Sequence, residues 1–337
     1  MNPDYDVIIV GAGFSGIGLA LRLKRAGLDN FVILESETGV GGTWWVNRYP
    51  GCACDVQSHL YSLSFAPNPN WSRHFPAREE IQSHLEQVVK QGNLLPHIHF
   101  NTKVETATWN EDDNLWTVTD QSGQEQTARV LISAMGGLST PKWPEIKGLN
   151  DFRGAVFHSQ QWPEDIDLTG LKVGVIGTGA SAVQFIPHVA KQASQLTVFQ
   201  RTPNWILPKP DRAISSMHRW FYQNIPPIRW LLRLALFLLL ETRLPAFTRF
   251  PKLAYFHRKK AIKHLQSQVQ DSALWDALTP AYPMGCKRVL MSNDFYPSFN
   301  RPNVSLITQS IKCITPTGIV DGSGTAHEFD VLILGTG

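Results

Sequence analysis

The chain has 337 residues, which is enough for about two domains that each bury a core of their own. Its 31 Lys and Arg residues against 28 Asp and Glu residues give a net charge of +3, too small a basic excess to indicate a nucleic-acid partner. The N-terminus, MNPDYDVIIVGAG, carries acids where a signal peptide needs basic residues, and the four cysteines show no pairing pattern, so we expect a cytoplasmic protein.

Residues 5–35 have the pattern of a dinucleotide-binding unit. A β-branched strand runs into GAGFSG at 11–16, a helical apolar pattern follows, and a second strand, NFVILE, ends at Glu35. Glycines at such a turn let backbone N–H groups approach a pyrophosphate, the helix N-terminus adds positive potential, and the acid accepts a hydrogen bond from a ribose hydroxyl. The candidate cofactor residues here are Gly11, Gly13, Phe14, Ser15, Gly16 and Glu35.

Residues 171–202 repeat this pattern with one change of charge. The turn is GTGASA at 177–182, and the following strand ends in Arg201 and Thr202 instead of an acid. A guanidinium can bind a 2′-phosphate that a carboxylate would repel, so NADPH is favoured over NADH. The alternative is that Arg201 is a solvated surface charge. The candidate residues are Gly177, Thr178, Gly179, Ser181, Ala182, Arg201 and Thr202.

One acidic and one basic dinucleotide site on the same chain suggest FAD and NADPH, and therefore hydride transfer into a flavin. Two further buried strands, VLISAMG at 130–136 and VLILGTG at 331–337, resemble each other. Such a strand, running into small residues, is typical of a chain that finishes one nucleotide domain and crosses to another. We therefore expect the chain to re-enter the first domain at 329–337.

The segment 210–283 has helical patterns interrupted by prolines, as expected for short helices inserted into a larger domain. Its apolar run at 234–240 falls far short of the roughly 20 residues that span a bilayer. Arg229, Arg233 and Arg243 fall on one side of a helical wheel, so 228–247 could lie weakly on a membrane surface or line an apolar substrate entrance. The alternative is a packed helix within the insertion.

Three further stretches carry a family resemblance. They are GGTWWVNRYPGCACD at 41–55, FRGAVFHSQQWP at 152–163 and GCKRVLMSNDFYPSFNRPNV at 285–304. With the two glycine turns, they make the chain resemble type I Baeyer-Villiger monooxygenases, a class B flavoprotein monooxygenase family that uses FAD and NADPH. Family members continue past the last residue here, so the resemblance also implies C-terminal truncation.

The resemblance implies an enzyme that converts ketones to esters or lactones with NADPH and O2, through a C4a-peroxyflavin. One alternative is a flavin-containing monooxygenase that oxygenates N or S atoms, although such enzymes generally lack Trp at the position of Trp162. Another is an inactive, truncated nucleotide-binding fragment. The sequence does not indicate which ketone is oxidised or which oligomer forms, and its histidines show no metal-site spacing.

The resemblance also assigns roles to residues. Arg288 would be catalytic, because a permanent cation keeps an oxygen adduct anionic and stabilises the oxyanion that follows. Asp55 would orient Arg288 and the nicotinamide, the alternative being a loop Asp that caps a helix in the residues after it. Lys287 would help to hold the 2′-phosphate. The remaining FAD contacts implied are Thr43, Trp44, Asp55, Tyr61 and Val104.

In FRGAVFHSQQWP, we expect a connector between the two nucleotide domains. Gly154 would give its backbone freedom, while Phe152, His158 and Trp162 would anchor alternate faces to the two domains. His158 would then act through conformation and hydrogen bonding, with a merely structural histidine as the alternative.

Together these patterns predict an α/β fold of two Rossmann-like dinucleotide-binding domains, for FAD and NADP, with an inserted helical subdomain. We expect the FAD domain at 1–145 and again at 329–337, the fingerprint linker at 146–165, the NADP domain at 166–209 and 284–328, and the insertion at 210–283.

Overall fold

The structure, a computed structural model, describes residues 2–242, 245 and 254–337, and it divides into two compact units. The first comprises residues 1–46, 62–68 and 78–140, and the second comprises residues 47–61, 69–77 and 141–337. Residues 47–61 and 69–77, which we predicted within the first domain, therefore belong to the second unit. Part of the predicted surface segment 228–247, at 243–244 and 246–247, lies outside the described residues.

The first unit is built on one mixed sheet. Its elements are β1 (Tyr5–Val10), α1 (Phe14–Arg25), β2 (Phe31–Leu34), α2 (Thr43–Val46), α3 (Arg78–Gln91), η1 (Leu95–His97), β3 (Ile98–His99), β4 (Val104–Asn110), β5 (Leu115–Asp120) and β6 (Glu125–Ser133).

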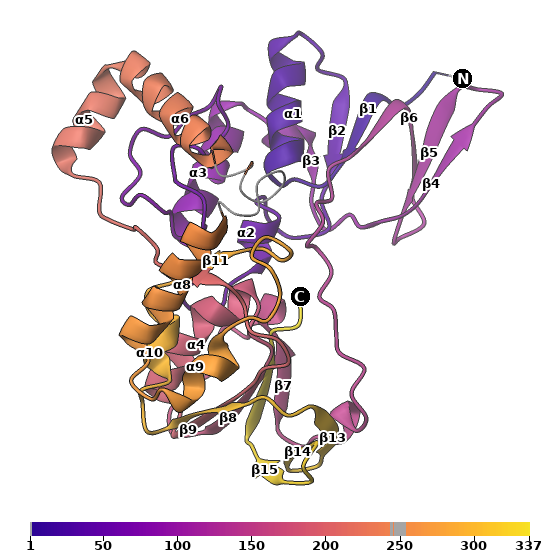
Figure 1. Cartoon of the computed structure of the whole chain (residues 1–337). Helices are drawn as coiled ribbons and strands as arrows, with labels where there is room; N and C mark the ends of the chain where they lie inside the picture. The colour runs from indigo at the N-terminus through magenta and orange to yellow at the C-terminus, as the bar shows by residue number, and fades with distance from the viewer. Residues whose placement is uncertain (1, 243–244, 246–253) are drawn as a thin grey trace. The chain divides into compact units, whose positions relative to one another are not determined.

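The strand order in this sheet is β3-β2-β1-β6-β5-β4 (Figure 1). The first four strands in that order are parallel, whereas β5 and β4 continue from β6 as an antiparallel meander. Ile8, Val32 and Leu34 form a buried cluster with Val118 and Ala128 of the meander. The β-branched residues of β1 and β2 thus build the Rossmann-like core that the sequence predicts.

The helices and strands of the second unit begin at residue 149. They are η2 (Leu149–Asp151), β7 (Ala155–His158), η3 (Ser159–Gln161), β8 (Lys172–Ile176), α4 (Ala180–Gln192), β9 (Gln195–Phe199), β10 (Ile206–Leu207), α5 (Ser216–Asn224), α6 (Pro226–Glu241), α8 (Ala254–Gln268), α9 (Ala273–Leu278), β11 (Leu290–Met291), α10 (Phe295–Ser298), β12 (Val304–Ile307), β13 (Ile311–Thr315), β14 (Gly318–Asp321), β15 (Ala326–Glu328) and β16 (Val331–Leu334).

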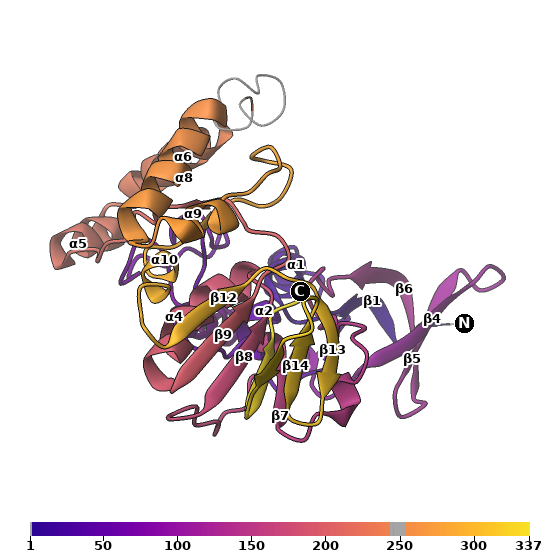
Figure 2. The ribbon, with the colours of Figure 1, turned by 60° about the horizontal axis from the view of Figure 1, so that its bottom comes forward.

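The main sheet of the second unit has the order β12-β9-β8-β16-β7, and all of its strands are parallel. Figure 2 shows β12, β9 and β8 side by side. After a first exposed residue, β8 and β9 are buried throughout, as expected for strands of a parallel sheet covered on both faces. A smaller antiparallel sheet, β13-β14-β15, completes this unit.

The position of β16 corrects one prediction. This strand, the VLIL of VLILGTG, pairs with β8 on one side and with β7 on the other. The expected return to the first domain at 329–337 is therefore wrong for this strand. A short, wholly buried apolar strand carries no information about which sheet it joins, because any parallel sheet can bury it on both faces.

The predicted helical segment begins and ends at two neighbouring strands of the second unit. Helices α5, α6, α8 and α9 lie between β10 and β11, which pair with each other in parallel. Within the described ranges, none of the helices combines the length and the apolar character that crossing a bilayer requires.

A short turn of the second unit fastens the first two inserted helices. The Tyr222 ring of α5 meets the His59 ring edge to face, with 4.6 Å between the ring centroids. Nη1 of Arg233, on α6, donates to the carbonyl oxygens of His59 and Leu60 at 2.9 and 3.0 Å. This packing buries His59, and burial lowers the pKa of its imidazole to about 4.

The buried imidazole predicts a pH-dependent stability. Above the ordinary pKa of 6.5, His59 is neutral both folded and unfolded; as the pH falls towards 4, only the unfolded chain binds the proton, so stability is lost. His59 alone should cost about 2 kcal/mol of the free energy of unfolding at pH 5. Urea unfolding of the native chain and His59→Asn at pH 7.5 and pH 5 measures this. Equal pH-dependent losses in the two proteins would contradict the assignment.

Candidate functional site

The glycine turn after β1 is closed too tightly for any side chain. Gly11 has a φ of +104°, and a Cβ atom there would lie 2.8 Å from the carbonyl oxygen of Ala134. A Cβ atom on Gly16 would overlap the carbonyl oxygen of Gly11. The motif therefore holds the backbone in the conformation that brings the start of α1 up to the end of β1.

Glu35 follows β2 and is 5% exposed. Its Oε2 accepts a hydrogen bond from the Ala12 N–H at 2.6 Å, and its Oε1 accepts from the Glu37 N–H at 2.9 Å. Helix α1 has Gly13 at its N-cap and no acid in its first turn, which contains Phe14 and Ser15. A fixed carboxylate beside an uncapped helix start fits the ribose and pyrophosphate of a dinucleotide such as FAD.

The turn after β8 repeats this construction. Gly177 has a φ of +102°, and a Cβ atom there would lie 2.5 Å from the carbonyl oxygen of Gly335. Helix α4 has Gly179 at its N-cap, carries no acid in its first turn and includes Ser181. Ala182, in place of the third glycine, is fully buried. A Cβ atom on Gly335 would lie 3.1 Å from the Ala182 methyl group, so residue 335 must be small.

A cavity of about 540 Å³ lies in the second unit at the end of β9. Two predicted cofactor residues, Arg201 and Thr202, line it. The other lining residues are Gln200, Pro203, Asp276, Ala277, Thr279, Ala281, Tyr282 and Thr308. The sequence analysis missed this second set, most of which comes from the end of the helical insertion.

Hydrogen bonds tie the insertion to this cavity. Nε2 of Gln200 donates to the carbonyl oxygen of Ala277 at 2.8 Å, and the Tyr282 hydroxyl donates to the carbonyl oxygen of Pro203 at 3.1 Å. Nζ of Lys287 lies 5.0 Å from the centre of the Tyr282 ring, a cation–π contact. With Arg201 in the wall and Lys287 beside it, the cavity fits a dinucleotide that carries a 2′-phosphate, as NADPH does.

Asp55 and Arg288 form an ion pair within the second unit. Nη2 of Arg288 donates to both carboxylate oxygens of Asp55, at 2.5 and 2.7 Å. The Arg288 side chain is 62% exposed, so its guanidinium can receive a further anionic partner. Residues 56–65 form turns, which removes the alternative that Asp55 caps a helix. The adjacent side chains of Lys287 and Arg288 have different partners, the Tyr282 ring and the Asp55 carboxylate.

Cys54 packs beside this pair but has no reactive form near neutral pH. Its Sγ accepts a hydrogen bond from the Val56 N–H at 3.4 Å, and the thiol is free. Burial raises the pKa of Cys54 to about 12, so the thiol stays protonated. Cys52 is likewise buried and forms no disulfide, so the two cysteines of the CAC stretch are small core residues.

The fingerprint motif at 152–163 packs into the second unit instead of connecting the two units. Phe152 joins the buried cluster of Ile176 and Phe199. β7 forms the edge strand beside β16, and the Trp162 ring lies 5.1 Å from Phe157 and 5.3 Å from Phe185. The rings of Phe152 and Trp162 thus anchor the motif to the second unit, while its anchoring to the first domain stays a prediction.

Gly154 and His158 are both enclosed by neighbouring groups. Gly154 is needed for close approach, since a Cβ atom there would overlap the Asp330 carbonyl oxygen and lie 2.6 Å from the Phe152 ring. His158 is 2% exposed, and its Nδ1 accepts a hydrogen bond from the Gln160 N–H at 3.2 Å. Burial lowers the pKa of His158, so it is neutral around pH 7.

The remaining predicted FAD residues are divided between the units. Thr43 and Trp44 belong to α2, where Nε of Arg78 donates to the Trp44 carbonyl oxygen at 2.8 Å. Val104 begins β4, and its half-buried side chain packs against the core of the first unit. Asp55 and Tyr61 belong to the second unit. The structure therefore does not bring the whole predicted FAD set together within one unit.

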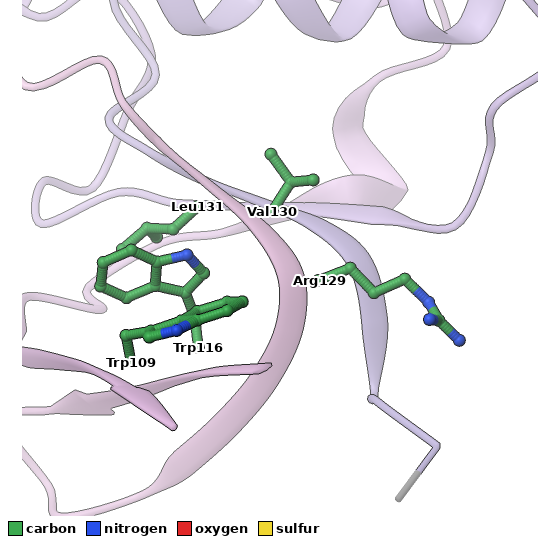
Figure 3. A pocket seen from close by; sticks show the side chains of 5 residues that line it. All are labelled: Trp109, Trp116, Arg129, Val130 and Leu131. Carbon is green, nitrogen blue, oxygen red and sulfur yellow. The ribbon is translucent and has the colours of Figure 1, made fainter. Parts of the chain in front are cut away.

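A second cavity, of about 520 Å³, lies on the meander of the first sheet (Figure 3). Trp109 and Trp116 are paired across β4 and β5, with 5.5 Å between their ring centroids, and Val130 and Leu131 complete the lining with Arg129. The Arg129 side chain points away from the two indoles. This cavity includes none of the predicted cofactor residues.

Comparisons with known proteins agree with the two-unit architecture. Residues 8–225 match the family model described as pyridine nucleotide-disulphide oxidoreductase. A Baeyer-Villiger monooxygenase of Pseudomonas aeruginosa is 48% identical over 98% of this chain and 63% of its own length.

Two solved structures are similar along almost the whole chain. Oxidised steroid monooxygenase bound to NADP matches with a TM-score of 0.88 and 34% identity, over 99% of this chain and 71% of its own. The complex of OTEMO with FAD and NADP matches with a TM-score of 0.87 and 32% identity, over 100% and 72%. The chain thus spans less than two thirds of the length of its curated relative from P. aeruginosa.

The packing of Gly154 predicts a large effect of a single methyl group. Gly154→Ala should destabilise the second unit by about 3 kcal/mol, since neither the Asp330 carbonyl nor the buried Phe152 ring can move aside cheaply. Gly137→Ala is the matched control, because a Cβ atom there meets nothing within 4 Å. Thermal and urea unfolding of both variants measures the difference. Similar, small losses would mean that Gly154 is not held by close contact.

Proposed function

Because this chain belongs to the pyridine nucleotide-disulphide oxidoreductase family, and within it to the Baeyer-Villiger monooxygenases, we propose that it oxidises a ketone to an ester or lactone with NADPH and O2. The Arg288–Asp55 ion pair supports this most directly, because it fixes a permanent cation next in sequence to Lys287. The activity is proposed for a chain that spans 63% of the length of its P. aeruginosa relative.

The first unit would hold FAD. The backbone N–H groups at Gly13, Phe14 and Ser15 would face its pyrophosphate, and Glu35 would accept from a ribose hydroxyl. Bound FAD would supply the redox chemistry, accepting a hydride and then reacting with O2. The complex of OTEMO with FAD and NADP supports this assignment for a related protein.

The second unit would hold NADPH. Its turn at Gly177 would face the pyrophosphate, and Arg201, Thr202 and Lys287 would contact the 2′-phosphate. Two cations at this position favour NADPH over NADH, because only NADPH carries the 2′-phosphate that they would neutralise. We assign NADPH binding to a domain at 166–209 and 284–328, with an insertion at 210–283.

Arg288 would act on charge that develops during oxygen transfer. Its guanidinium keeps its proton at any physiological pH, so it can stabilise negative charge on the attacking oxygen and on the carbonyl oxygen of the ketone. Asp55 binds one guanidinium nitrogen and fixes the orientation of the group without neutralising it by proton transfer. A ketone and O2 are the proposed reaction partners.

The cytoplasm is the proposed location. All four cysteines, Cys52, Cys54, Cys286 and Cys313, are free thiols, which is compatible with a reducing compartment. NADPH is also kept reduced there by metabolism, so the proposed reductant and the thiols suit the same environment.

Removing the cation at position 288 should separate NADPH consumption from product formation. With FAD, NADPH, O2 and a cyclic ketone, Arg288→Ala should oxidise NADPH at a comparable rate but form ester about 100-fold more slowly, because oxyanion stabilisation is lost. Asp55→Asn should slow ester formation less, since the cation remains. Gas chromatography with parallel NADPH absorbance measures both. Undiminished ester formation in Arg288→Ala would remove Arg288 from the mechanism. If the native chain oxidised a thioether in preference to the ketone, an N- or S-oxygenase would be favoured instead.

The charge of Arg201 can be tested by binding alone. Arg201→Ala should weaken binding of 2′,5′-ADP about tenfold or more, while binding of 5′-ADP changes little, because a charge-assisted hydrogen bond to the 2′-phosphate is lost. Isothermal titration of both nucleotides measures this. Arg212→Ala, which removes an exposed arginine outside the cavity, is the matched control. Equal weakening of both nucleotides would contradict the phosphate assignment.

A further inference from the structure

Helices α5 and α6, labelled in Figure 1, carry many large apolar side chains that are exposed. Large exposed side chains on these helices include Trp220, Trp230, Leu231, Leu234, Phe237 and Leu238, of which Leu234 is 38% exposed and Trp230 63%. None of the 16 residues of α6 is fully buried. Scattered exposed apolar residues are ordinary, but consecutive helical turns of Trp, Leu and Phe are typical of an interaction surface.

Most of the exposed side chains of α6 form one stripe. Trp230, Leu234, Phe237 and Leu238 follow the spacing i, i+4, i+7 and i+8, which places them along one side of a helix. Arg233 borders this stripe, three residues after Trp230 and four before Phe237, and donates to the carbonyl oxygens of His59 and Leu60. Its guanidinium therefore holds the edge of the stripe to the protein.

Both helices are fixed with their apolar faces outward. α5 contacts the His59 ring through Tyr222, and α6 is bonded to the backbone of the same turn through Arg233. Turning the apolar face of α6 inward would break these contacts and leave the guanidinium of Arg233, whose pKa burial already lowers, without its carbonyl partners. The outward orientation is thus a property of the packed protein.

The charge of this region is strongly one-sided. Between Arg212 and Gln270 the sequence contains one acid, Glu241, and 11 Lys and Arg residues, whereas the whole chain has 28 acids and 31 basic residues. The rest of the chain is therefore net acidic. On α8, Arg258, Lys259 and Lys260 are exposed, as are the rings of Tyr255 and Phe256 just before them. Exposed aromatic rings beside basic side chains suit the boundary between anionic headgroups and acyl chains.

We propose that the α5–α6 face docks on the surface of a bilayer that contains anionic phospholipid. The Trp, Leu and Phe side chains of α6 enter the headgroup boundary, while Lys and Arg side chains of the insertion bind headgroup phosphates. The helix lies on the bilayer without crossing it, because its 16 residues extend only about 24 Å, less than a hydrocarbon core of roughly 30 Å. This inference does not depend on the proposed oxygenation.

A second copy of the chain or a soluble protein could also cover an apolar helix face. The charge pattern favours lipid over a second copy, because a two-fold interface would bring the basic insertions of both copies together. It also explains why almost all acids are missing from this stretch and present elsewhere. An anionic lipid surface matches both features at once.

Vesicle sedimentation tests the proposal with the intact chain. The native protein should sediment with phosphatidylglycerol-containing vesicles at low salt, bind pure phosphatidylcholine vesicles much more weakly, and be partly released by high salt. Leu234→Glu should reduce the partition coefficient on anionic vesicles at least about tenfold, because it places a carboxylate in the apolar face. Leu28→Glu, at a residue of the first unit that is 51% exposed, is the matched control and should bind like the native chain.

Unfolding curves of both variants establish that each is folded under the conditions of the vesicle assay. Absence of native binding to anionic vesicles, or equal losses in Leu234→Glu and Leu28→Glu, would overturn the proposal. Light scattering adds a third outcome. A native dimer that Leu234→Glu converts to monomer, without vesicle binding by the native chain, would show a self-association surface instead and would also overturn it.

Discussion

Two close approaches of backbone to backbone determine how each unit offers a dinucleotide site. Gly11 lies against the carbonyl oxygen of Ala134, just past β6, and Gly177 lies against the carbonyl oxygen of Gly335, just past β16. In both units the strand pairing ends at this point, where glycine with a positive φ turns the chain into the following helix. The uncapped starts of α1 and α4 are thereby brought to the carboxyl ends of the strands, where dinucleotides bind in such sheets.

Local pattern was sufficient to predict the parts of the fold that depend on neighbouring residues. The strands and helices around both glycine turns lie where alternating burial and helical periodicity place them, and the two similar strands ending at Ser133 and Leu334 occupy equivalent positions in their units. What local pattern could not supply was the partner of a strand. VLIL is buried from end to end, as is FVIL of β2, and either would fit the middle of either sheet. The assignment of 329–337 to the first domain failed for that reason.

The site shows the same division. Arg201 was predicted from the charge at the end of a strand, and Asp55 and Arg288 were predicted from motifs. The structure brings Asp55 and Arg288 together although they lie far apart in the sequence. Gln200, Asp276 and Tyr282 carried no comparable signal, because two of them reach the cavity only after the insertion has folded back on β9. Gly154 was predicted to give the backbone freedom, but in the structure it is a closely packed position. The Asp330 carbonyl and the Phe152 ring leave no space for a Cβ atom at this position, whereas the φ of Gly154 is not one that favours glycine.

One segment of six residues, 55–60, contacts both the inserted helices and Arg288. Asp55 binds Arg288 at one end of that segment, while His59 and Leu60 fasten α5 and α6 at the other. Backbone bonds from the N–H groups of Leu60 and Tyr61 to the Gln57 carbonyl oxygen, both 2.9 Å, make the intervening turn compact. The inserted helices and the Asp55–Arg288 ion pair are therefore held by one short hydrogen-bonded turn of the second unit, so the sequence at 55–60 serves both.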